Sequence, residues 1–171
     1  MNLSKRGEYA LRVLLELAMA RSAGIPLVPL AVIVRTQNIP ANFLEQILAS
    51  LRQAGHLNAT RGKRGGYSLA PATLDLSVGS LVRFLDGPLA PIACASLSAY
   101  KRCTCPDESR CGVRHLMIEA RNALSSVLDG ITLGALAERT LAPFTAAGEQ
   151  PALIRELLSP AKKSGEPEYS I

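Results

Sequence analysis

The chain has 171 residues, of which 48% are hydrophobic, 19% are charged and 4% are aromatic. This composition can bury a core, which argues against a disordered chain. The longest uncharged apolar run, at 27–34, is far too short to span a bilayer, so no transmembrane helix is expected. Charged residues interrupt the only stretch that could act as a signal peptide. The chain is therefore expected in the cytoplasm, without a membrane partner.

The formal net charge of +5 is concentrated at the N-terminal end. Residues 1–70 carry +6, residues 71–130 carry no net charge and residues 131–171 carry −1. A basic N-terminal module suggests a polyanion such as nucleic acid as its partner. The low aromatic content argues against single-stranded nucleic acid, which is bound by base stacking.

The first elements in the chain predict a helix-turn-helix. Ser4 can cap a helix whose pattern ends at residues 23–24. A short apolar stretch at 30–34, a turn at 37–40 and an amphipathic helix at 41–54 follow. Residues near the start of the second helix of such a motif read base edges. The candidates are Ala41, Asn42, Glu45 and Gln46.

A β-hairpin is expected directly behind this motif, with strands at 56–60 and 68–70. In that position the hairpin would be a wing, although a tight hairpin with solvated charges is the alternative. Glycine lets the loop backbone approach phosphate, and a wing-tip arginine can enter a narrow minor groove. The candidate DNA-binding residues of the wing are Arg61, Lys63, Arg64, Gly65, Gly66 and Tyr67.

The second half of the chain predicts a long helix that pairs with its copy. A helix at 78–85 is followed by a loop without periodicity at 87–110. Apolar residues then recur at helical spacing from Val113 to Ile131, which predicts a helix over 111–129. So small a domain cannot cover that stripe, which favours a homodimer. A short helix at 132–139 and a frayed tail after residue 160 complete the prediction.

These elements predict a mainly α-helical fold with one small β-hairpin. Residues 1–86 would form a winged helix-turn-helix DNA-binding domain, and residues 87–110 a cysteine-bearing sensor loop. Residues 111–140 would form the dimerisation helix and a short following helix. Residues 141–171 would form a partly disordered C-terminal extension.

The sensor loop and the start of the long helix contain all the cysteines, namely Cys94, Cys103, Cys105 and Cys111. In the cytoplasm such cysteines are metal ligands or redox thiols more often than structural disulfides. Their clustering suits an iron–sulfur cluster. Zinc and a thiol–disulfide switch remain alternatives. Cys111 with His115 could be a catalytic pair, but no orienting acid or oxyanion loop accompanies them, so no enzyme is predicted.

Six segments together resemble the Rrf-type winged-helix transcription regulators, the family of IscR, NsrR, RirA and CymR. The resemblance covers residues 1–140 and is carried by Leu3–Leu11, Phe43–Leu48, Leu51–Gly55, Arg61–Tyr67, Pro91–Cys94 and Leu128–Leu133. It implies a homodimeric DNA-binding regulator, expected to be a repressor, with a near-palindromic operator in double-stranded DNA. It also implies base reading by Glu45 and Gln46 and a minor-groove contact by Arg61.

The same resemblance implies an iron–sulfur cluster, 2Fe-2S or 4Fe-4S, that controls DNA binding and senses redox state, nitric oxide or iron–sulfur status. Cys94, Cys105 and Cys111 match the three cysteine ligands of the family, and Glu8, reaching across the dimer, matches an acidic fourth ligand. Cys103 and His115 are the weaker candidates. A regulator of the same fold without a cluster, using a thiol switch or zinc, is the alternative.

Overall fold

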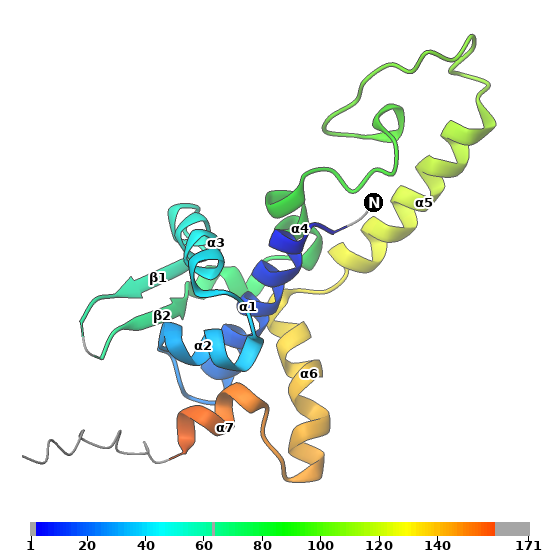
Figure 1. Cartoon of the computed structure of the whole chain (residues 1–171). Helices are drawn as coiled ribbons and strands as arrows, with labels where there is room; N and C mark the ends of the chain where they lie inside the picture. Colours follow the sequence, from blue (N-terminus) through cyan, green and yellow to red (C-terminus); the bar gives the residue numbers. More distant parts are fainter. Residues whose placement is uncertain (1–2, 63, 160–171) are drawn as a thin grey trace, which may run out of the picture.

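The computed structural model describes residues 3–62 and 64–159. Lys63 and the predicted tail after residue 160 lie outside these residues. The described chain is mainly α-helical with one hairpin, as predicted (Figure 1). The elements are α1 (Lys5–Ser22), α2 (Leu30–Gln37), α3 (Ala41–Gln53), β1 (Leu57–Thr60), β2 (Gly66–Leu69), η1 (Pro71–Asp75), α4 (Val78–Asp86), η2 (Ala93–Ala95), α5 (Gly112–Asp129), α6 (Leu133–Ala147) and α7 (Ala152–Leu158).

Helix α1 forms the centre of the main core and is contacted by α3, α4, α6, α7 and β2. Ser4 caps it, because the Ser4 side chain accepts a hydrogen bond from the Gly7 N–H at 3.0 Å. The Ser4 N–H also donates to the Asp86 carboxylate at 2.6 Å, which joins the start of α1 to the end of α4. A Cβ at Gly7 would lie 2.4 Å from Asp86 Oδ2, so a larger residue there would have to displace the Asp86 side chain.

The helix-turn-helix consists of α2 and α3. Asn38 ends α2 in the left-handed conformation, with φ 51°, which asparagine adopts more readily than most residues. The apolar stripe of α3 is buried as predicted, at Leu44, Ile47, Leu48 and Leu51. Burial of this stripe leaves the opposite face of α3 exposed.

The wing is an antiparallel pair in which Leu57 faces Leu69 and Thr60 faces Gly66. The second strand therefore begins earlier than predicted, and Gly66 and Tyr67 belong to it rather than to the loop. The reason is a bridge to the segment before α2: Val28 and Tyr67 exchange two backbone hydrogen bonds of 2.9 Å each. A Cβ at Gly66 would lie 2.5 Å from the Val28 carbonyl oxygen, so glycine permits this contact.

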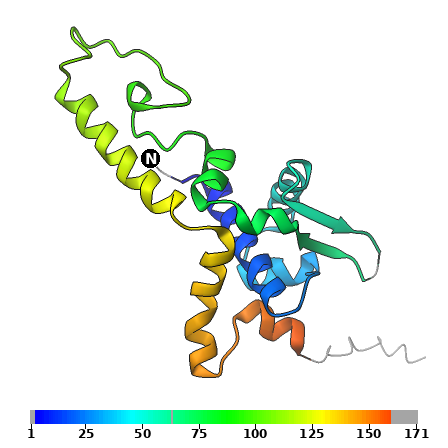
Figure 2. The ribbon, with the colours of Figure 1, turned by 180° about the vertical axis from the view of Figure 1, so that it is seen from behind.

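Helix α5 packs on α4 only at its C-terminal end. Leu124, Leu128 and Ile131 cover the small core formed by Val78, Val82 and Leu89. An ion pair of 2.6 Å between Arg83 and Asp129 joins the two helices. The rest of α5 projects from the body together with the cysteine loop, as both views show (Figures 1 and 2).

The C-terminal helices differ from the prediction. Helix α6 does not end at Arg139 but continues to Ala147, with Pro143 inside it, a residue that usually ends or kinks a helix. Residues 152–158, part of the extension predicted to be partly disordered, form α7, and its Leu153 and Ile154 are fully buried. Helix α7 packs against α1 and α2, and Arg35 donates a 2.8 Å hydrogen bond to Glu156. No helix in the described residues is long and apolar enough to cross a membrane.

Candidate nucleic-acid interface and cysteine pocket

The exposed face of α3 carries the four residues predicted to read bases. Ala41, Asn42, Glu45 and Gln46 are all exposed, opposite the buried stripe. Pro40 precedes the helix and provides no side-chain cap, so the first backbone N–H groups of α3 are left for another partner. This end of a helix carries partial positive charge and attracts anions such as phosphate.

A groove lies between the wing and the helix-turn-helix. Its volume is about 350 Å³, and it is lined by Leu30, Arg52, Ala59, Thr60, Arg61, Gly62, Gly65, Gly66 and Tyr67. Arg61 and Arg64 are exposed, while Gly65 and Gly66, which belong to the wing, are half-buried. Sequence reasoning missed Arg52, whose position in the last turn of α3 was its only local signal. Lys63 lies outside the described residues. The groove thus places arginine side chains beside glycine backbone that a phosphate group can approach closely.

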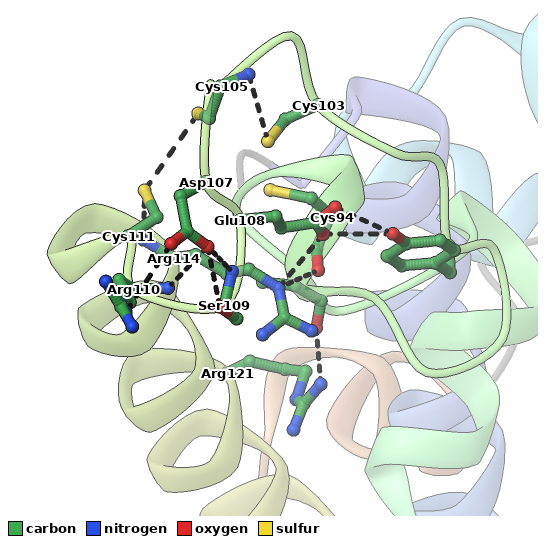
Figure 3. A network of polar contacts seen from close by, with 12 residues as sticks. Cys94, Cys103, Cys105, Asp107, Glu108, Ser109, Arg110, Cys111, Arg114 and Arg121 are labelled. Carbon is green, nitrogen blue, oxygen red and sulfur yellow. Dashed lines mark hydrogen bonds and ion pairs between the residues drawn. The ribbon is translucent and has the colours of Figure 1, made fainter.

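All four cysteines line or border one pocket between the loop and the start of α5 (Figure 3). The pocket has a volume of about 380 Å³ and is lined by Ile92, Ala93, Cys94, Lys101, Arg102, Cys103, Cys105, Cys111 and Val113. The Cys105 and Cys111 sulfur atoms are 4.0 Å apart, and the Cys105 N–H donates to the Cys103 sulfur at 3.4 Å. Residues from both ends of the loop therefore converge without any disulfide among the described cysteines.

Short-range hydrogen bonds shape this loop. The Asp107 carboxylate accepts from the N–H and the hydroxyl of Ser109, at 3.0 and 2.6 Å, which forms a turn just before Cys111. Cys111 then caps α5, because its sulfur accepts from the Arg114 N–H at 3.5 Å. Arg114 also donates to the Cys94 carbonyl at 3.0 Å, which ties the far end of the loop to the same helix.

The thiols of the pocket differ in their electrostatics. Burial, followed by the neighbouring Cys103, raises the pKa of Cys94. Hydrogen bonds from the Cys105 side chain and backbone lower the pKa of Cys103. Hydrogen bonds with Cys103 and Cys111 raise the pKa of Cys105 to about 12. Cys103 is therefore the cysteine of this trio whose surroundings favour thiolate, the form that binds metals.

Glu108 belongs to the same cluster and was missed by sequence reasoning. Its carboxylate, the Cys94 sulfur and the Cys103 sulfur all lie within 4.8 Å of one another. Arg114 forms a 3.1 Å ion pair with Glu108, and the Tyr100 hydroxyl lies 2.9 Å from the same carboxylate. Its place between two cysteines was the only available signal, and Asp107 shared it. Only the folded loop shows which of the two acids faces the sulfur atoms.

The remaining predicted ligands, Glu8 and His115, are not among the residues that line the pocket. Glu8 pairs with Lys5 at 2.8 Å and with Arg12 at 3.7 Å, and the hydrogen bond from Lys5 lowers the pKa of Glu8. His115 is exposed one turn after Cys111. The predicted role of Glu8 requires a second copy of the chain, so it stays a prediction.

Comparisons with known proteins agree with the family resemblance seen in the sequence. A model of the Rrf2 family, described as iron-dependent transcriptional regulators, matches residues 3–139. A putative rrf2-like regulator of Rhodobacter capsulatus is 41% identical over 133 residues, which cover 77% of this chain and 89% of that protein. The regulator CymR of Bacillus subtilis is 32% identical over 82% of this chain and 92% of its own length. The regulator IscR of Vibrio atlanticus is 35% identical over 80% of this chain and 75% of its own length.

Solved structures resemble the fold as well. CymR, the global cysteine regulator of B. subtilis, aligns with a TM-score of 0.66 at 31% identity, and the alignment covers 81% of this chain and 98% of CymR. IscR of T. potens aligns with a TM-score of 0.62 at 27% identity and covers 82% of this chain and 88% of its own. These neighbours bear out the predicted winged-helix architecture.

Proposed function

The chain belongs to the Rrf2 family of transcriptional regulators, and we propose that it is a repressor that binds a near-palindromic operator in double-stranded DNA as a homodimer. The family assignment predicted from the sequence is confirmed, and the relatives are regulators rather than enzymes. The exposed face of α3 would read base edges in the major groove, while Arg61 would enter the adjacent minor groove. The cationic groove beside the wing supports this docking mode.

The projecting part of α5 supports the homodimer. Val113, Leu116 and Val127 are 63%, 58% and 70% exposed, and with Ala120 and Ala123 they recur at alternating steps of three and four residues. This spacing forms a continuous seam of the kind that pairs two helices. A two-fold dimer built on this seam would carry two copies of α3, which accounts for the expected symmetry of the operator.

We further propose that an iron–sulfur cluster in the cysteine pocket controls operator binding. The single observation that carries this is the convergence of four thiols on one mainly apolar pocket, because thiolate is the ligand such clusters require. The donor set therefore fits the group. Cys94, Cys105 and Cys111 would hold it, with the partner's Glu8 as an oxygen ligand. When bound, the cluster would supply sensitivity to redox state, nitric oxide or iron–sulfur status.

A ligand on α1 would couple the pocket to the DNA-binding module. Glu8 lies in the first turn of α1, which contacts both α3 and β2. A change in the pocket that released Glu8 would alter the placement of those elements without any contact between the pocket and DNA. The coupling requires two arrangements of the module, one favoured by each state of the pocket.

The second candidate is a regulator without a cluster that uses a thiol switch or zinc. The 4.0 Å separation of the Cys105 and Cys111 sulfur atoms supports it, since a modest movement would bring them to bonding distance. Operator binding would then respond to the oxidation of this pair rather than to a cluster.

Anaerobic purification followed by absorption spectroscopy tests the proposal. Visible bands that disappear together with operator binding after exposure to oxygen or nitric oxide are expected. A colourless protein whose operator binding responds to a disulfide reductant would instead support the thiol switch. Reconstitution of Glu8→Ala, His115→Ala and Cys103→Ala then tests the ligands, with an altered spectrum expected for Glu8→Ala alone. A normal spectrum in Glu8→Ala with a lost one in His115→Ala would exclude the Glu8 assignment.

A further inference from the structure

The cysteine pocket contains a second set of ligands that shares only Cys94 with the proposed cluster ligands. In this set the Cys94 and Cys103 sulfur atoms and a Glu108 carboxylate oxygen lie within 4.8 Å of one another. Two ligand atoms of one tetrahedral zinc ion, at bond lengths of about 2.3 Å for sulfur and about 2.0 Å for oxygen, lie about 3.5–3.8 Å apart. Shifts of up to about 1 Å would therefore bring all three atoms to a common ion.

The surroundings of Glu108 hold its carboxylate in place. The Tyr100 hydroxyl lies 3.0 and 2.9 Å from the two carboxylate oxygens, and Arg114 Nε lies 3.1 Å from Oε1. The Glu108 side chain is only 17% exposed. A carboxylate has about four acceptor sites, so these partners leave room for a metal bond. Outer partners of this kind orient metal ligands and raise affinity in known metal sites.

Cys103 is also prepared for a metal. The Cys105 backbone N–H donates to its sulfur at 3.4 Å, and a hydrogen bond to sulfur favours the thiolate that coordinates metal. Cys94 is buried at 7% exposure, which shields one side of the site from water. Two thiolates and one carboxylate suit zinc or ferrous iron rather than magnesium or calcium.

We propose that the reduced, cluster-free chain binds one divalent transition-metal ion, zinc or ferrous iron, through Cys94, Cys103 and Glu108. Each coordinating thiol gives up its proton to solvent as the metal bond forms, and no electron is transferred. Because Cys94 belongs to both ligand sets, the ion and the cluster exclude each other. The inference does not require that the cluster proposal be correct, since the three ligands are brought together by the loop alone.

Cobalt(II) is the probe for the test, because its bands report thiolate ligation directly. Reduced, metal-free, full-length protein is titrated with Co²⁺ without oxygen, and Zn²⁺ is then added as competitor. We expect one Co²⁺ per chain with a sulfur-to-cobalt charge-transfer band that Zn²⁺ abolishes. Cys103→Ala and Glu108→Gln should each weaken binding by about 100-fold or more, and Tyr100→Phe by about 10-fold. Circular dichroism of each variant confirms that it folds.

Cys105→Ser is the matched control, because it removes the thiol but keeps a side-chain donor beside the Cys103 sulfur, and it separates the two proposals. This variant should keep Co²⁺ binding but fail to reconstitute the cluster, whereas Cys103→Ala should lose Co²⁺ binding and still reconstitute it. Equal losses of Co²⁺ affinity in Cys103→Ala and Cys105→Ser would overturn the assigned ligand set. Absence of the thiolate band in the wild-type protein would also overturn it. Failure of cluster reconstitution in the wild type would overturn only the cluster proposal.

Discussion

Arg61 stands where β1 ends and the wing loop begins, exposed beside the groove that separates the wing from α3. A guanidinium at this place can follow the phosphate backbone into the minor groove. We expect Arg61→Ala to weaken operator binding by about 1–3 kcal/mol in a fluorescence anisotropy titration at fixed salt concentration, with unchanged thermal unfolding.

A matched control for Arg61 must remove the same charge at an exposed place away from the wing. Arg12 does not serve, because its guanidinium donates to the Gln37 carbonyl at 2.7 Å and joins α1 to α2. Arg139 is exposed on α6, so Arg139→Ala is suitable. An equal loss of operator affinity in both variants would mean that only net charge matters.

Glu16 is a half-buried acid on α1. Its Oε1 accepts a 2.5 Å hydrogen bond from Gln37, but its Oε2 is buried without a partner among the described residues. Burial raises the pKa of Glu16 above its usual value, more than the Gln37 hydrogen bond and the Arg12 charge lower it. The folded chain therefore holds this proton more tightly than the unfolded chain, so stability falls as the pH rises through the raised pKa.

Glu16→Gln should remove that pH-dependent cost, because Gln keeps the acceptor for Gln37 and cannot ionise. Above the raised pKa we expect the variant to exceed the wild type in the free energy of unfolding, because only the wild type must bury a charged carboxylate there. The difference should vanish at acidic pH, where the wild-type carboxyl is protonated. Urea unfolding at a series of pH values and one protein concentration measures this. Parallel curves for the two proteins would contradict it.

At the scale of single elements, α7 is held to the body by two buried side chains, Leu153 and Ile154. Leu153 is 0% exposed, so Leu153→Ala should leave a cavity and lower the free energy of unfolding by about 2–5 kcal/mol. Leu158, which is 59% exposed at the end of the same helix, provides the control, and Leu158→Ala should change stability very little. Equal effects would mean that α7 does not pack on α1 and α2 in solution.

The elements that could be predicted from the sequence are those with strong local signals. Ser4 was predicted as a helix cap, and like Ser77 and Thr132, residues of types that favour this position, it accepts a hydrogen bond from the third N–H of its helix. Helix α7 has no such signal, since it has seven residues and no side-chain cap. Its stability comes from burial against elements distant in sequence, which local patterns do not report.

The sequence likewise predicts some features of the candidate site and not others. The exposed face of α3 follows from helical periodicity, and the cysteines are conspicuous by their clustering. The orientation of Glu108 toward Cys94, by contrast, depends on Arg114 and Tyr100, which lie on opposite sides of it in the sequence. Likewise, Gly66 joins a strand because of Val28, which precedes the helix-turn-helix. Contacts of this kind form only in the folded chain, where separate segments come together, and local sequence patterns do not report them.

At the scale of the whole molecule, the apolar stripe of α5 serves two purposes rather than the single one predicted. Leu124, Leu128 and Ile131 face α4 in the same chain, so a charge at Leu124 would test the fold rather than the dimer. The exposed seam begins at Val113 and runs through Leu116 to Val127. The proposed dimer interface is this exposed seam, not the part of α5 that packs on α4.

Leu116→Glu should therefore separate the dimer, because two carboxylates would face each other across the seam. Sedimentation velocity at micromolar concentration should show a monomer with native circular dichroism. Asn122→Glu introduces the same charge on a different face of α5 and should leave the dimer intact. A dimer in Leu116→Glu, or a monomer in the wild type, would remove α5 as the interface.

The burial of α1 under α6 and α7 bears on how the protein is made. A ribosome releases α1 first, yet the helices that cover it come after the cysteine loop and α5 in the chain. Contacts so distant in sequence form late, since the intervening chain must be synthesised before they can close. The nascent α1 and α2 therefore stay incompletely covered until α7 has emerged. A chain arrested within α5 would carry α3 and the wing on an unfinished core, so we expect it to be less stable than the full chain.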